Sequence, residues 1–238
     1  MTAPAPTGPA LSPMLLRLAG ERATGTLSRP TGTLWLADGA VVHAESPFSP
    51  ALDLLLTAAG RIAPGVLTQG AREVCRLGAL FDAAYFALAP GSAPTRFRYG
   101  VVGGRGDGAH PVSAGAVERE CARRRELLDR TWPYPALDTA PVLPRELPPG
   151  QRVTRRQQAV LECADGLLDP AGIARRLGRP AFHTLLEVRR MAAAGLVDTP
   201  DDADTGPVLP AWIAGLPAPE DPDIALLRRL RDALEAHL

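Results

Sequence analysis

The N-terminal fold follows from one stretch, Gly32-Thr33-Leu34-Trp35-Leu36-Ala37-Asp38-Gly39-Ala40-Val41-Val42-His43-Ala44-Glu45. Leu34 and Leu36 alternate with more polar residues, as in a strand with one buried face. The Asp-Gly pair is typical of a two-residue turn, and an apolar strand resumes directly after it. The stretch therefore predicts a β-hairpin, with strands over 33–37 and 40–45 and a further strand over 25–29 before it.

Helix signals surround this hairpin. Ser12-Pro13 and Ser49-Pro50 each combine a capping residue with a proline at a helix start, and they predict short helices that end at Gly20 and just before Gly60. A longer helix over 71–88 has a wide apolar face, and 96–102 alternates like a returning strand. These signals predict an α+β module over 11–112, after a disordered tail over 1–10.

The rest of the chain divides by composition. A charged stretch over 113–132 predicts a connecting helix, and six prolines within 133–150 predict an extended linker. A helical unit over 151–199 is followed by an acidic, proline-rich linker over 200–222. The last segment, 223–238, predicts an amphipathic helix whose apolar stripe is a candidate partner-binding or homodimer surface: Ile224, Leu227, Leu230 and Leu234.

The unit over 151–199 contains three helix starts in close succession. Thr154 and Gln157 have the spacing of a capping box, and proline follows Asp169 and Arg179. A short helix, a turn, a longer helix and an apolar pair after glycine are typical of a winged helix-turn-helix. The predicted fold class is α+β, with a small hairpin-and-helix module followed by a winged helix-turn-helix domain.

Two functions remain open for this unit. It has eight arginines against five acids, but Glu187 lies centrally on the third helix and no basic hairpin follows. DNA binding as a transcription regulator is one hypothesis. The alternative is a signalling adaptor, whose third helix and C-terminal helix bind proteins instead. The candidate DNA contacts are Arg175, Arg176, Arg179, His183, Thr184 and Arg190.

The N-terminal half resembles the PatA-like N-terminal domain, a bacterial module of unknown function. The resemblance covers 11–112 and is carried by Gly25-Thr26-Leu27, 34–45, 54–56, 80–83 and 97–99. It implies signalling through protein contact and brings no catalytic residues with it. The unit over 151–199 is similar to the winged helices that follow this module in actinobacterial regulators. From those relatives this chain departs by lacking a basic wing.

Composition restricts the function classes further. The chain of 238 residues has 26 cationic and 26 anionic side chains, so a globally basic coat for nucleic acid is excluded. Three widely spaced cysteines favour a reducing compartment, and no apolar run reaches the about 20 residues that a membrane span needs. We therefore expect a cytoplasmic, soluble protein that does not bind a membrane.

Motifs for catalysis are also incomplete. His43-Ala44-Glu45 has the spacing of a zinc-deaminase His and Glu, but the required Pro-Cys-x-x-Cys does not follow. The glycine-rich run over 103–108 lacks the Lys-Ser/Thr of a phosphate-binding loop. We therefore predict a non-enzymatic regulatory protein that uses no cofactor and no metal.

Overall fold

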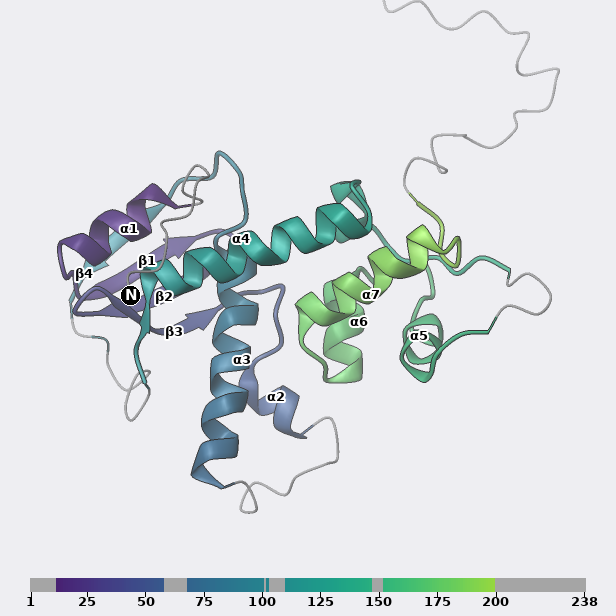
Figure 1. The fold of residues 1–238 in the computed structure, drawn as a ribbon, viewed down its shortest axis with the longest axis horizontal. Coiled ribbons are helices and arrows are strands. Elements are labelled where there is room, and N and C mark those ends of the chain that lie inside the picture. Colours follow the sequence, from purple (N-terminus) through teal and green to yellow (C-terminus); the bar gives the residue numbers. More distant parts are fainter. Residues whose placement is uncertain (1–11, 58–67, 101, 103–109, 147–151, 200–238) are drawn as a thin grey trace, which may run out of the picture. The chain divides into compact units, whose positions relative to one another are not determined.

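An antiparallel sheet forms the centre of the first part of the chain (Figure 1). The computed structural model describes residues 12–57, 68–100, 102, 110–146 and 152–199. In this part of the chain the sheet has five strands in the order β4-β1-β2-β3-β5. Their bounds are β1 Gly25–Arg29, β2 Gly32–Ala37, β3 Ala40–Glu45, β4 Arg96–Tyr99 and β5 Val112–Ser113. The three strands of the hairpin region are confirmed; the short β5 was not predicted.

The turn between β2 and β3 has the expected two-residue form. Asp38 and Gly39 both have positive φ, 47° and 78°. This left-handed pairing matches the twist of the flanking strands. A Cβ at Gly39 would lie 2.6 Å from the carbonyl oxygen of Ala19, so this position needs glycine for close approach as well as for its φ. The turn therefore also positions the first helix.

One face of the sheet is covered by helices α1 (Pro13–Gly20), α3 (Gln69–Ala87) and α4 (Ala114–Thr131). Alternate strand residues such as Leu27, Leu34 and Leu36 point into this core, where they meet apolar residues of the three helices. A short helix, α2 (Leu52–Thr57), precedes α3. The side chain of Ser12 caps α1 as predicted, and Thr68 and Ser113 cap α3 and α4. The predicted cap at Ser49 is wrong, because α2 begins only at Leu52 and the hydroxyl of Ser49 donates to Asp82 instead.

Three further helices form the predicted C-terminal unit: α5 (Arg155–Leu161), α6 (Pro170–Leu177) and α7 (Ala181–Ala193). Thr154 and Gln157 make the predicted capping box on α5. Asp169 caps α6, which ends at Gly178 in the left-handed conformation. The α+β class is thus confirmed.

The interpretation of 133–150 as an extended linker is wrong for its described part, 133–146. Pro135–Asp138 forms a 3-10 helix, and Leu137 and Val142 are fully buried among residues of α5, α6 and α7. Leu143 and Arg145 make backbone hydrogen bonds to Asp198 and Leu196. The density of prolines predicts an extended linker, but the apolar residues between the prolines, Leu137 and Val142, pack into a hydrophobic core. Proline has no backbone N–H, but the residues beside it can still form backbone hydrogen bonds.

Several predicted segments lie outside the described residues. They are the tail over 1–10, the acidic linker over 200–222 and the amphipathic helix over 223–238, which includes Ile224, Leu227, Leu230 and Leu234. Among the helices that are described, none has the length and apolar character needed to cross a membrane.

Candidate functional site

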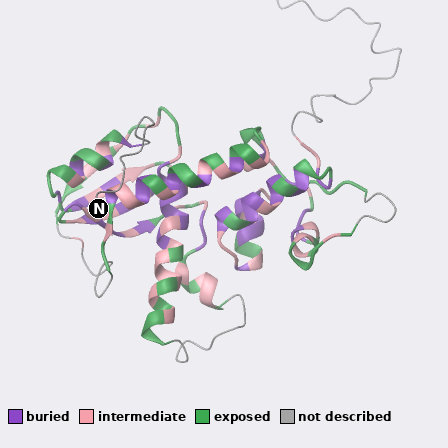
Figure 2. Cartoon of the chain, in the orientation of Figure 1, coloured by how far each residue is buried: buried purple, intermediate pink, exposed green. Residues whose placement is uncertain are grey.

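Helix α7 lies between two hydrophobic cores. Phe182, Leu185 and Leu186 join the core of the sheet, whereas Val188, Met191 and Ala192 join the core that contains α5 and α6. The predominance of purple along α7 shows this burial (Figure 2). His183, Glu187 and Arg190, spaced by three and four residues, remain as a narrow accessible stripe. The predicted recognition helix is therefore also a packing element.

The start of α7 is held by Asp82 of α3. Helix α7 has no side-chain cap of its own, because its N-cap residue is Pro180. The carboxylate of Asp82 takes that role: its Oδ2 accepts from the backbone N–H of Ala181 at 2.7 Å, and its Oδ1 from that of Phe182 at 2.9 Å. Asp82 is fully buried. A carboxylate at a helix N-terminus satisfies unpaired donors and interacts favourably with the helix dipole.

Neighbouring groups complete the surroundings of Asp82. The hydroxyl of Ser49 donates to Oδ2 at 2.7 Å, and Nη1 of Arg124 lies 3.7 Å from Oδ1. Arg124 also stacks over the ring of Phe182, 4.6 Å from its centroid. Thus one buried cluster joins α3, α4 and α7. The sequence offered no signal for it, because its members are far apart along the chain.

A second buried ionic cluster holds the other side of α7. The guanidinium of Arg189 donates to both carboxylate oxygens of Asp138, at 2.7 and 2.6 Å, and to the carbonyl of Trp132 at 2.6 Å. Arg189 is 2% exposed. Burial raises the pKa of Asp138, although the hydrogen bonds from Arg189 oppose this shift. The cluster ties α7 to the 3-10 helix of the proline-rich segment.

The accessible stripe of α7 lines a groove of about 590 Å³ between α5 and α7, which we call the basic groove. Four arginines and one acid, Glu187, contribute to its walls. Arg190 and Glu187 form an ion pair in this groove, with 3.6 Å between Nη1 and Oε2, and the pair is partly exposed. The lining residues are Arg155, Arg156, Val160, Arg179, Pro180, His183, Thr184, Leu186, Glu187 and Arg190.

The groove collects four of the six predicted DNA contacts: Arg179, His183, Thr184 and Arg190. Partial burial is the main influence that lowers the pKa of His183; the charge of Arg124 adds to this shift, and that of Asp82 opposes it. The groove also adds Arg155 and Arg156, which sequence reasoning missed. The available signal was their position in the first turn of a capped helix, beside Thr154.

Three of the predicted contacts interact with other groups of the protein in the structure. Thr184 is 3% exposed and its hydroxyl donates to the carbonyl of Pro180, so it has little surface to offer a ligand. Arg175 donates to the carbonyl of Pro47, and Arg176 pairs with Asp165 at 3.6 Å. Neither arginine lines the groove. Their position just before the third helix predicts both as DNA contacts, but position along the chain does not say in which direction a side chain extends.

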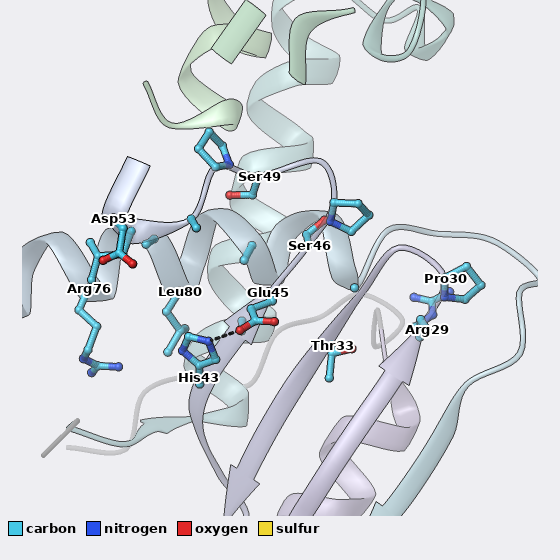
Figure 3. A pocket seen from close by; sticks show the side chains of 18 residues that line it. Arg29, Pro30, Thr33, His43, Glu45, Ser46, Ser49, Asp53, Arg76 and Leu80 are labelled. Atoms are coloured by element: carbon cyan, nitrogen blue, oxygen red, sulfur yellow. Dashed lines mark hydrogen bonds and ion pairs between the residues drawn. The ribbon is translucent and has the colours of Figure 1, made fainter. Parts of the chain in front are cut away.

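A second cavity of about 710 Å³ lies between β3, the segment before α2, and α3 (Figure 3). His43 and Glu45 meet in it at 3.0 Å. Arg76 also lines it, but its guanidinium is held by Glu73 and by the carbonyl of Val42. Within the described residues no group of three or more His, Cys, Asp or Glu is placed to hold a metal ion. In this cavity His43 and Glu45 bind each other, whereas the guanidinium groups of Arg29 and Arg76 are held by Ala89 and Glu73, which lie outside it.

Comparison of the sequence with protein-family models, with curated proteins and with solved structures finds no match.

Proposed function

We propose that this chain is a non-enzymatic regulatory protein that acts as a signalling adaptor and binds an acidic segment of a protein partner in the basic groove. One observation carries the proposal: α7 is buried on two sides, and the accessible polar side chains of this helix form the stripe of His183, Glu187 and Arg190. The proposal thus takes the helical unit as a protein-binding element coupled to the sheet module.

The start of α7 argues against reading of DNA bases. In helix-turn-helix proteins the N-terminal residues of the recognition helix contact base edges in the major groove. Here Ala181, Phe182 and Thr184 are buried, and the first two donate their N–H groups to Asp82. Insertion of α7 into DNA would require these contacts to break. The accessible stripe of α7 is one residue wide. Such a stripe suits the side wall of a groove that binds a ligand better than it suits a helix that enters the major groove of DNA.

The segment after α7 also differs from a DNA-contacting wing. Val197 forms a bridge with Pro144, and the side chains of Asp198 and Arg145 pair at 2.5 Å. The proline-rich segment therefore lies beside the residues that follow α7. Arg145, the nearby cation, is already matched by an acid, which leaves little free positive charge for phosphate at this position.

The groove chemistry favours carboxylates on a protein. Arginine binds carboxylates in a planar, bidentate geometry, and Arg155, Arg156 and Arg179 have no acid within salt-bridge distance among the described residues. A concave site about 590 Å³ in size accommodates a few side chains of an extended acidic segment. Such a site is smaller than a duplex footprint, which spreads over many phosphates.

Nonspecific DNA binding is the second candidate, because the same four arginines could contact phosphates. The test uses the full chain and two fluorescent probes, a Glu-rich peptide and a random-sequence duplex, at about 50 and 200 mM salt. We expect the peptide to bind more tightly than the duplex. Arg156→Glu and Arg190→Glu should each weaken peptide binding about tenfold or more.

The matched control is Arg98→Glu, which makes the same charge change at an exposed position on β4, outside the groove. It should leave peptide binding within about twofold. Tighter, steeply salt-dependent duplex binding that is lost in Arg156→Glu would replace the adaptor by a DNA-binding regulator. Absence of binding to either probe would reject the groove as a site.

A further inference from the structure

A third cavity, about 470 Å³ in size, lies where the sheet module meets the helical unit. Its walls come from the end of α3, from α4, from the 3-10 helix and from α7, and they are mainly apolar. The rings of Tyr85 and Phe86 meet edge to face at 5.0 Å, and Phe48 lies 6.3 Å from Phe86. Cavities of this size and character, at the junction of two packed parts, are typical of small-molecule sites.

Two donors in this wall have no acceptor among the described residues. Nη2 of Arg125 donates to the carbonyl of Leu88, but Nη1 is buried without a partner. The hydroxyl of Tyr85 also lacks a hydrogen bond in this part of the chain, and burial raises the pKa of Tyr85 to about 12, so the hydroxyl keeps its proton. The Arg125 guanidinium lies 5.6 Å from the centroid of the Tyr85 ring, so the two side chains are neighbours in the cavity wall.

The acids of the wall are already engaged. Asp138 receives two hydrogen bonds from Arg189, and Asp129 lies 3.6 Å from the same guanidinium. Arg125 is therefore the lining cation without an acid partner in the described residues. A buried donor that lacks an acceptor costs free energy, and an anionic acceptor recovers it best.

We infer that this cavity binds a small, mainly apolar carboxylic acid, with its carboxylate on Arg125 and Tyr85 and its apolar body against Phe48, Phe86 and Leu185. The acid would contact α3, α4 and α7 together. It would therefore stabilise the arrangement that holds α7, and it gives the regulatory protein an input separate from the basic groove. The inference does not depend on what binds in that groove.

The test is calorimetric titration of the full chain with octanoate and with octanol, which share an apolar body and differ in charge. We expect saturable binding of octanoate that is tighter than that of octanol. Arg125→Met should weaken octanoate binding about tenfold, because a charge-assisted hydrogen bond is lost, and should leave octanol binding within about twofold. Tyr85→Phe should weaken octanoate binding less, since a neutral donor is removed.

Two further variants, one inside the cavity and one outside it, test whether octanoate binds in this cavity. Ala89→Phe adds a ring to the wall at a half-buried position, whereas Ala122→Phe adds the same ring at an exposed position of α4 outside the cavity. Ala89→Phe should abolish octanoate binding and Ala122→Phe should retain it, with both variants checked for native circular dichroism. Equal binding by these two variants, equal affinity for acid and alcohol, or no saturable octanoate binding would each overturn the inference.

Discussion

Arg189 and Arg190 are neighbours in the sequence of α7, but they lie in opposite environments. Arg189 is 2% exposed and its guanidinium is held by Asp138 and by the carbonyl of Trp132. The side chain of Arg190 is 53% exposed, lines the basic groove and, among the described residues, forms an ion pair only with Glu187, at 3.6 Å. One helical step turns a side chain by about 100°. The inner face of α7 is therefore structural and its outer stripe is available for binding.

The comparison teaches that a count of arginines does not measure a binding surface. Arg124 and Arg189 are cations whose charges are used inside the protein, against Asp82 and Asp138. Removal of one partner from a buried ion pair leaves the other uncompensated, whereas an exposed pair exchanges its partner for water. The two faces of α7 should therefore respond very differently to the same kind of substitution.

The largest effect is expected at Asp82, which anchors the inner face. Asp82→Ala removes the acceptor for two backbone N–H groups and the partner of Arg124, so we expect the free energy of unfolding to fall by about 3–5 kcal/mol. Urea denaturation measures this loss. The control is Asp53→Asn, at an exposed acid of α2, which should cost less than about 1 kcal/mol. Equal losses in both variants would contradict the anchoring role.

The next largest effect is expected at Arg189. Arg189→Met should destabilise the protein by about 3 kcal/mol, because Asp138 stays buried without its cation. Addition of Asp138→Asn to this variant should restore part of the loss, since it removes the uncompensated charge. A double-mutant cycle in urea measures the coupling between the two residues. Additive losses would show that the pair is not coupled.

A small effect is expected one residue further along the helix. Arg190→Met should change the free energy of unfolding by less than about 1 kcal/mol, because its pair with Glu187 is long and exposed. Thermal unfolding of Arg189→Met and Arg190→Met side by side tests the comparison between the two faces directly. Equal destabilisation of Arg190→Met and Arg189→Met would contradict the difference between the two faces of α7.

The smallest effect is a pH dependence at Glu120, which joins the exposed Arg123 to the buried Arg124. The hydrogen bond from Arg123 is the largest influence on the pKa of Glu120, which falls from 4.5 to about 2; Arg124 adds to the shift and burial opposes it. The unfolded chain binds more protons in that interval, so this contribution to stability is present above pH 4.5 and is lost as the pH falls towards 2.

We therefore expect Glu120→Gln to make the urea midpoint less dependent on pH in this acidic interval. Glu126→Gln is the matched control on the same helix, because Glu126 is 66% exposed and lies 3.7 Å from Arg130. A pH profile of Glu120→Gln that coincides with that of the unmodified chain would show that the Glu120 pair does not contribute.

Local signals predicted local structure well. The Asp38-Gly39 turn, the strands beside it and the capping residues Ser12, Thr154 and Asp169 all act within a few residues, and each has the predicted role. The α+β class followed from the same signals. Periodicity also identified the apolar residues of α7, because a 3.6-residue repeat is visible without knowledge of what covers it.

The candidate site was predicted only in part. Arg179, His183 and Arg190 do line one groove with exposed surface, but Arg155 and Arg156 join them only because α5 packs beside α7. Arg175 and Arg176 leave it because their partners, Pro47 and Asp165, come from other parts of the fold. No spacing rule relates these pairs.

The sequence by itself determined where the chain turns, where its helices begin and which residues are apolar, since these properties depend on neighbours along the chain. The tertiary structure decided which charges are structural. Asp82 caps a helix that starts about a hundred residues later, and Asp138 in the proline-rich segment binds Arg189 of α7. The free energy lost when a charged residue is removed depends on how deeply its ion pair is buried, and burial arises only when distant segments pack together.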